Sequence, residues 1–330
     1  MKRIEWIDSM KGYAICMMMF SHIEYAPDFI KNFISPIFLA LFFIASGYTF
    51  RPSSDFKTFF FKKVRTVLWP WLVFGSFNIF LTQILTFSEQ EPLKQQFISL
   101  FLQIRGQNDG LWFFPCIFCV SNLFFLLQKY IRSEKIFFCI QPCLLLAGMF
   151  YTMSGGSDLP WHIQMWGSGC FYMTIGYFYR QKEKQLIFLS KKSAALVFFV
   201  IFTLSYVLCN ILYTDVHINF YDYGPSICFY FIIMLSGAAF SVSILQQLPA
   251  FRIVQYTGRS SLLYFAFHGK PKRLLSVVIT RLLPMAETDW RIGLLFSVIE
   301  LVILTYILVI PCEIIHRFFP FLLGKKRTNT

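Results

Sequence analysis

The chain has 330 residues, of which 56% are apolar, 20% aromatic and only 14% charged, and its mean hydropathy is +0.58. Because soluble domains carry about 25% charged residues, these values exclude a soluble enzyme, a disordered protein and a disulfide-rich secreted module. Apolar runs of about 20 residues recur along the chain, as in helices that cross a bilayer. The sequence therefore predicts an all-α, polytopic transmembrane helical bundle, with residues 1–330 forming one integral-membrane domain.

The formal net charge of +13 does not indicate a nucleic-acid partner. The basic residues are dispersed between apolar runs and do not gather on one domain, so we expect contacts with membrane lipids and none with nucleic acid. Nearly all nine cysteines lie within apolar runs, and Cys116 and Cys119 have no His or carboxylate close by in the sequence. We therefore expect no metal site.

Ten apolar segments predict ten membrane spans. They fall at about 12–26, 33–50, 66–86, 111–128, 137–153, 168–180, 194–213, 226–246, 261–283 and 292–312. Acidic residues gather in the odd-numbered connections, namely Glu24, Asp28, Glu89, Glu91, Asp109, Asp158, Asp215, Asp222, Glu287 and Asp289. Basic residues gather in the even-numbered connections and at the chain ends, namely Lys2, Arg3, Arg51, Lys57, Lys62, Lys63, Arg65, Lys129, Arg132, Lys135, Arg180, Lys182, Lys184, Lys191, Lys192, Arg252, Arg259, Arg317, Lys325, Lys326 and Arg327. By the positive-inside rule both termini are cytoplasmic, and residues 313–330 form a basic cytoplasmic tail.

The first predicted span carries ionisable residues unusually close together. Only 12 residues separate Lys11 from Glu24, fewer than the roughly 20 that cross the hydrocarbon. Lys11 and His22 are 11 positions apart, so on a helix they share one face, roughly 16–17 Å apart along its axis. An ionisable group at membrane depth is a candidate for function. The alternative is that Lys11 reaches the lipid headgroups and His22 is a satisfied histidine at the interface.

The ninth predicted span is interrupted by the run Lys270-Pro271-Lys272-Arg273. Charged residues inside a span need water or partners, and a proline breaks a helix. Two interpretations remain open. Either two half-segments line a hydrated cavity, or a loop begins at this run and the span covers Leu274–Met285.

Five sequence fragments occur in order along the chain. Each is a short motif, and they are Asp8-Ser9-Met10-Lys11-Gly12 followed by His22, Phe42-Phe43-Ile44-Ala45-Ser46-Gly47-Tyr48, Phe61-Lys62-Lys63-Val64-Arg65 followed by Pro70, Gly110-Leu111-Trp112-Phe113, and Tyr256-Thr257-Gly258-Arg259-Ser260-Ser261-Leu262-Leu263-Tyr264 followed by His268. Together they resemble the membrane-bound acyltransferase-3 family, in particular its fucose 4-O-acetylase-like and polysaccharide O-acetyltransferase members. Lys11 stands where many members of the family have arginine.

The resemblance implies an acyl-CoA-dependent O-acetyltransferase of the plasma membrane, the inner membrane of a bacterium. Its donor would be cytoplasmic acetyl-CoA, and its acceptor a hydroxyl of a cell-surface glycan or a lipid-linked sugar. No permanently bound cofactor is implied.

The resemblance also implies roles for individual residues. His22 would be the catalytic base, since imidazole titrates near neutral pH, with Lys11 beside the donor. Glu24 points elsewhere on a helix, so the residue that orients His22 must come from another span. Three basic residues would bind the CoA phosphates, namely Lys62, Lys63 and Arg65. Three others would contact the substrate, namely Ser46, Trp112 and His268.

Alternatives stay open for several of these residues. The basic cluster can reflect the positive-inside rule without binding CoA, and Trp69 and Trp71 are typical of an interfacial aromatic belt. His162 is interpreted as an interfacial anchor, or else it stacks against a sugar. Two other functions compete with acyl transfer: a secondary transporter, which would more often show internal repeats, and a glycan-assembly subunit without catalysis.

Overall fold

The computed structural model describes residues 4–52, 55–85, 91–107, 110–214 and 216–325. Within these ranges the chain forms helices joined by turns, and its extended pairing is limited to an isolated bridge between Ile218 and Tyr223. The all-α prediction is confirmed. Seven charges used for the topology prediction lie outside the described residues, namely Lys2, Arg3, Glu89, Asp109, Asp215, Lys326 and Arg327.

The chain divides into two compact units. Unit 1 comprises Met1–Thr49 and Ile175–Cys312, and unit 2 comprises Phe50–Thr174 and Glu313–Thr330. Two helices include residues of both units, namely α8 (Trp166–Gln181) and α16 (Val309–Phe318).

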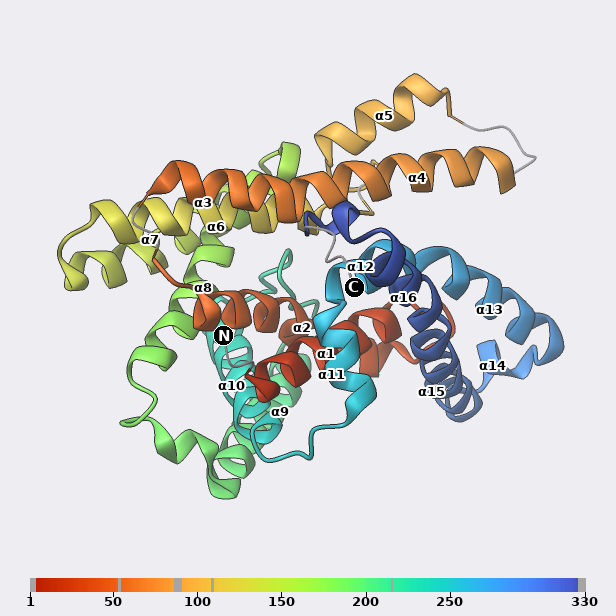
Figure 1. The fold of residues 1–330 in the computed structure, drawn as a ribbon. Coiled ribbons are helices and arrows are strands. Elements are labelled where there is room, and N and C mark those ends of the chain that lie inside the picture. Colours follow the sequence, from red (N-terminus) through yellow and green to blue (C-terminus); the bar gives the residue numbers. More distant parts are fainter. Residues whose placement is uncertain (1–3, 53–54, 86–90, 108–109, 215, 326–330) are drawn as a thin grey trace. The chain divides into compact units, whose positions relative to one another are not determined.

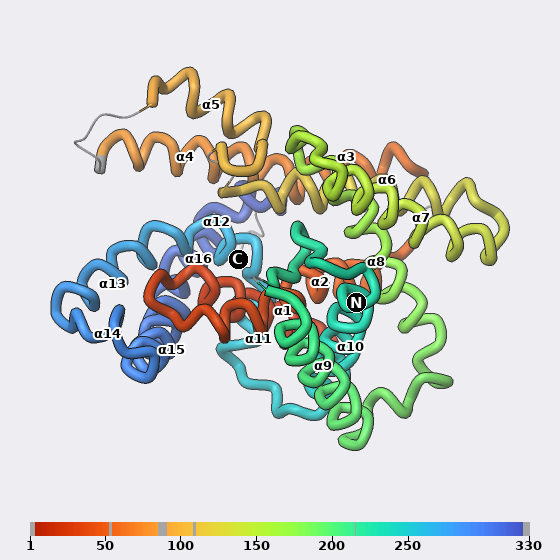
Figure 2. The backbone as a smooth tube through the Cα atoms, turned by 180° about the vertical axis from the view of Figure 1, so that it is seen from behind, coloured from red at the N-terminus to blue at the C-terminus, as the bar shows by residue number. Residues whose placement is uncertain are grey.

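Besides its share of α8 and α16, the described part of unit 1 forms ten helical elements. They are α1 (Glu5–Ser21), α2 (Asp28–Thr49), the 3₁₀ turn η3 (Ile187–Ser190), α9 (Lys192–Leu212), α10 (Ile227–Leu245), α11 (Arg252–Arg259), α12 (Ser261–Phe267), α13 (Gly269–Leu282), α14 (Met285–Thr288) and α15 (Trp290–Ile307). The first helix, α1, packs against α2, α11 and α15, and α13 and α14 both pack on α15, as Figures 1 and 2 show from opposite sides.

Two glycines allow α1 and α11 to approach closely. A Cβ at Gly12 would collide with the carbonyl oxygen of Val254, and one at Gly258 would collide with that of Asp8. No larger residue fits at either position without moving a backbone. Gly12 and Gly258 belong to the first and last sequence fragments, so these fragments meet at one helix–helix contact.

Unit 2 contains α3 (Phe56–Lys63), the π-helical turn η1 (Val64–Leu68), α4 (Trp69–Leu85), α5 (Leu93–Leu102), α6 (Phe113–Tyr130), α7 (Glu134–Met153) and the 3₁₀ turns η2 (Pro160–Met165) and η4 (Pro320–Leu323). The elements α3, η1 and α4 follow one another as a continuous rod (Figure 1). Asp55 caps its start by accepting a bond from Thr58 N at 2.9 Å. That bond also holds the pKa of Asp55 below its ordinary value.

The expectation that Lys57, Lys62, Lys63 and Arg65 lie in a loop is therefore wrong. The cap at Asp55 starts the helix some ten residues before the apolar run does. The basic residues occupy the helical start of the span.

Seven helices of the described chain are long and apolar enough to cross a bilayer. They are Asp28–Thr49, Phe56–Ile84, Phe113–Tyr130, Glu134–Met153, Lys192–Leu212, Ile227–Leu245 and Trp290–Phe318. Each corresponds to one predicted span, so the protein is a multi-pass membrane protein. The other three predicted spans correspond to the shorter α1, to α8 and to the pair α12 and α13. The count of ten and the cytoplasmic termini stay predictions.

The ninth predicted span consists of two helices. α12 ends at Phe267, α13 begins at Gly269, and His268 lies at the bend between them. Pro271 does not break the helix, because it lies in the first turn of α13, where a backbone N–H has no partner within the helix. The alternative of a loop followed by a span over Leu274–Met285 is wrong, and the two-segment interpretation is confirmed; a hydrated cavity stays a prediction.

Candidate functional site

His22 is the first residue after α1 and begins the turn that leads to α2. Its N–H still bonds to Met19 O at 3.2 Å, but the helix ends at Ser21. The segment expected to be helical as far as residue 26 is thus a turn from His22 onward. It ends at Pro27, which lacks the N–H that a continuing helix would use.

Apolar side chains hold this turn in unit 1. Ile23, Tyr25 and Ala26 are buried and cluster with Phe20 and with Ala286 of α14. The residues between them, His22 and Glu24, are exposed. The alternation anchors the turn from one side and presents the imidazole of His22 on the other.

His22 faces a second histidine from a distant part of the sequence. The ring centroids of His22 and His268 are 5.4 Å apart, with an interplanar angle of 34°. The Nδ1 atom of His268 lies 2.9 Å from Phe265 O. Because a carbonyl oxygen only accepts, Nδ1 carries the proton, and Nε2 of the neutral ring is left as an acceptor. The structure thus brings together two of the predicted site residues, one from each end of the chain.

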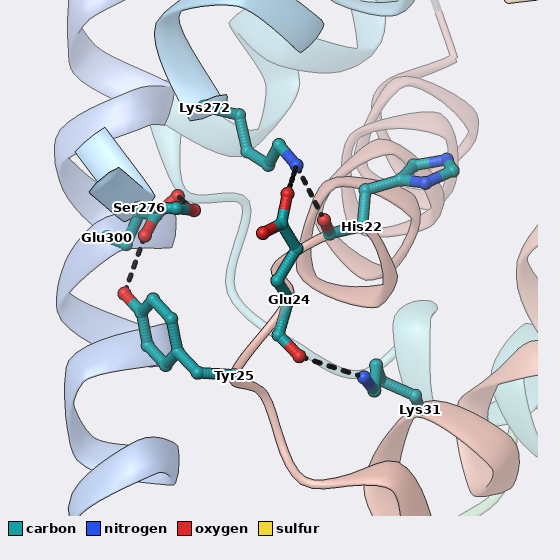
Figure 3. Close-up of polar contacts among 7 residues, drawn as sticks. All are labelled: His22, Glu24, Tyr25, Lys31, Lys272, Ser276 and Glu300. Atoms are coloured by element: carbon teal, nitrogen blue, oxygen red, sulfur yellow. Dashed lines mark hydrogen bonds and ion pairs between the residues drawn. The ribbon is translucent and has the colours of Figure 1, made fainter. Parts of the chain in front are cut away.

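Lys272 connects α13 to the turn that carries His22. Its Nζ donates to His22 O at 3.0 Å and lies 3.3 Å from Glu24 Oε1 (Figure 3). On the other side, Lys31 Nζ donates to Glu24 O at 3.3 Å and pairs with Asp28 at 2.7 Å. Lys272 of α13 therefore holds the backbone of His22, whereas the prediction that a residue of another span orients its imidazole stays a prediction.

A buried carboxylate lies behind the turn. Glu300 of α15 is fully buried and accepts from Tyr25 Oη at 2.5 Å and from Ser276 Oγ at 2.8 Å. Figure 3 shows this group beside Lys272 and Glu24. The sequence analysis missed Glu300. The available signal was a single carboxylate inside the apolar run 292–312, a placement that costs free energy unless the group has partners.

The other predicted site residues of unit 1 lie apart from the histidine pair or form a hydrogen bond within their own helix. Lys11 is half-buried on α1, three turns before His22. Ser46 Oγ donates to Phe42 O of the same helix at 2.8 Å. The substrate role of Ser46 stays a prediction.

In unit 2, the predicted CoA-binding residues differ in exposure. Lys62 and Arg65 are exposed, whereas Lys63 is half-buried and donates to Ser121 Oγ of α6 at 3.1 Å. Lys63 also lies over the Phe59 ring at 5.5 Å. Lys62 and Arg65 therefore remain the better candidates for phosphate contacts, and Lys63 joins α3 to α6.

The aromatic predictions for unit 2 need correction. His162 is fully buried and its ring centroid lies 4.8 Å from that of Trp112. Trp71 is also buried, between Phe101 and Trp161 at 5.9 Å from each. Neither His162 nor Trp71 is an interfacial anchor, because the surrounding aromatic residues cover them.

In the part of the chain that the structure describes, no group of three or more His, Cys, Asp or Glu side chains is placed to hold a metal ion, and none of the nine cysteines forms a disulfide bond.

Comparison with protein families gives one match that covers nearly the whole chain. The family model described as an acyltransferase domain, type 3, matches residues 4–314. The matched range includes His22, His268, Lys272 and Glu300. No curated protein matches the chain. No solved structure matches it.

Proposed function

The chain belongs to the acyltransferase-3 family, and from this premise we propose that it moves an acetyl group from cytoplasmic acetyl-CoA to a hydroxyl of a cell-surface glycan or its lipid-linked precursor. Membrane acyltransferase is the activity of the family domain. The donor, the acceptor and the bacterial inner membrane as location are our proposal. The observation that carries it is the pair formed by the exposed His22 and the half-buried His268, whose ring centroids lie 5.4 Å apart.

The pair suits the proton transfer that acyl transfer requires. His22 takes the proton of the acceptor hydroxyl as the oxygen attacks the thioester carbonyl. The tetrahedral intermediate then collapses, the carbon–sulfur bond breaks, and the imidazolium of His22 returns the proton to the departing thiolate. No proton or electron pair is left over, so the step needs no further reactant.

His268 suits a positioning role toward the acceptor. Its Nδ1 is engaged by Phe265 O, so the ring is held in one orientation and one tautomer. Nε2 is then available to accept a bond from a sugar hydroxyl beside His22. The substrate role of Trp112 stays a prediction.

The donor contacts rest on charge. CoA is a polyanion, and arginine and lysine are the side chains that bind phosphates. Lys11, Lys62 and Arg65 are the candidates, with acetyl-CoA as a transient substrate and not a resident cofactor. Substitution of Lys11 by Ala is expected to raise the KM for acetyl-CoA more than it lowers kcat.

Purified protein with acetyl-labelled acetyl-CoA and glycan acceptors tests the proposal. We expect the labelled acetyl group to appear on the glycan, together with an equal molar amount of released CoA. Accumulation of labelled solute inside vesicles without covalent transfer would instead establish the rival transporter. If neither covalent transfer nor uptake occurs, the result favours an assembly subunit.

A further inference from the structure

Glu300 bonds to both segments that carry the histidine pair. Its Oε2 accepts from Tyr25, three residues after His22, and its Oε1 accepts from Ser276 of α13. α13 begins directly after His268. One carboxylate on α15 is thus connected to the turn with His22 and to the helix with His268.

The sequence of α13 places these contacts on one face. His268, Lys272 and Ser276 follow at intervals of four residues, and Lys272 N bonds to His268 O at 3.0 Å, so the helical spacing starts at the histidine. Lys272 reaches the turn through His22 O, and Ser276 reaches Glu300. Each connection along this face runs toward the turn or toward α15.

A carboxylate is suited to this junction because it has two acceptor oxygens. Each oxygen accepts one donor from a different segment, which an apolar side chain cannot do. Burying a carboxylate costs free energy that its hydrogen bonds must offset. Tyr25 is buried with its ring in the apolar cluster, so the hydrogen bond of its hydroxyl to Glu300 fixes the turn relative to α15.

We propose that Glu300 is a positioning residue for acyl transfer: through Tyr25 and Ser276 it holds the His22 turn and α13 at the separation that sets the 5.4 Å distance between the two imidazole rings. We call the contacts of Glu300 with Tyr25 and Ser276 the clamp. The expected effect of the clamp on the transfer rate rests on the proposed function, but the clamp itself is a property of the fold. Glu300 does not touch the reacting atoms.

Substitutions at Glu300 distinguish the loss of its two hydrogen bonds from a general loss of protein stability. Glu300→Gln keeps both contacts, since the amide oxygen accepts from Tyr25 and the amide nitrogen donates to Ser276 Oγ. Glu300→Ala removes both. We expect Glu300→Gln to keep kcat within about threefold, and Glu300→Ala and Tyr25→Phe to lower kcat at least about tenfold with the KM for acetyl-CoA unchanged. A matched control is Ser297→Ala, because Ser297 is equally buried on α15 but donates within its own helix to Gly293 O at 2.7 Å.

Hydrogen–deuterium exchange of residues 20–30 gives a readout that does not depend on activity. The full-length protein in lipid nanodiscs is compared as wild type, Glu300→Ala, Glu300→Gln and Ser297→Ala. We expect faster exchange of the Ile23 and Ala26 amides in Glu300→Ala only. Unchanged exchange there, or equal acceleration in Ser297→Ala, would overturn the clamp. If Glu300→Ala shows faster exchange but the wild-type protein transfers no acyl group, the result would uphold the clamp and refute the proposed function.

Discussion

At the scale of single residues, the site depends on where α1 ends. His22 and Glu24 would share a helix with Lys11 if α1 continued, but the helix stops at Ser21 and both side chains are presented by a turn. The apolar residues Ile23, Tyr25 and Ala26 fix that turn. The side-chain ammonium groups of Lys272 and Lys31 then donate to two of its carbonyl oxygens. The imidazole is consequently positioned by groups that do not bond to the ring.

Lys272→Ala is expected to lower the transfer rate about tenfold. Its ammonium reaches His22 O from a side chain that is only 12% exposed, and charged donors give stronger bonds than neutral ones. Arg273→Ala is the matched control, since Arg273 is the next residue of α13 and is exposed. Steady-state rates of both variants at saturating acetyl-CoA provide the measurement, and an equal loss in both would show that Lys272 has no special part.

At the scale of elements, close backbone contacts explain two of the sequence fragments. The resemblance pointed to them without a reason for their glycines. The structure shows that Gly12 and Gly258 are the points at which α1 and α11 touch. The first fragment therefore serves both the packing of α1 and, eleven residues later, the site.

Gly12→Ala and Gly258→Ala are each expected to destabilise unit 1 by about 1–3 kcal/mol or more, because the added methyl group must push two backbones apart. Gly269→Ala is the control, since a Cβ there meets nothing within 4 Å. Thermal unfolding in detergent, followed by intrinsic fluorescence, measures the difference. Equal melting temperatures for all three variants would contradict the close contact.

Pro271→Ala is expected to change the melting temperature by no more than the Gly269→Ala control does. Proline in the first turn of a helix sacrifices no hydrogen bond, and Pro271 is the third residue of α13. A large loss of stability on this substitution would mean that the bend at His268 depends on the proline ring and not on the contacts of Lys272 and Ser276.

At the scale of the whole molecule, hydropathy and charge predict much of the architecture. Long apolar runs of the sequence coincide with the seven helices that are long enough to cross a bilayer. Three features escaped prediction for physical reasons. The cap at Asp55 depends on a local hydrogen bond, the end of α1 depends on tertiary packing of Tyr25, and the contact of Glu300 joins residues 275 positions apart. The resemblance names His268 as a substrate contact, but its pairing with His22 was not predicted, because spacing within one sequence does not reveal contacts between distant segments.

The orientation of the chain follows from the charge alternation and is open to direct test. A small accessible tag placed next to Lys184 should be reached only from the cytoplasmic side, and one next to Ser157 only from the opposite side. Protease protection in sealed vesicles of both orientations measures this. Tags at the two positions reached from the same side would contradict the alternating topology.

The central claim is that His22 is the base for acyl transfer. Its most direct test compares wild type, His22→Ala and the control His217→Ala, which removes an exposed histidine of the same unit. Acetyl transfer and acetyl-CoA binding are measured on the same purified samples. We expect His22→Ala to lose transfer by at least about 100-fold, the range for a general base, while it binds acetyl-CoA as the wild type does and His217→Ala keeps full activity. Transfer by His22→Ala at a rate close to that of the wild type would contradict the central claim.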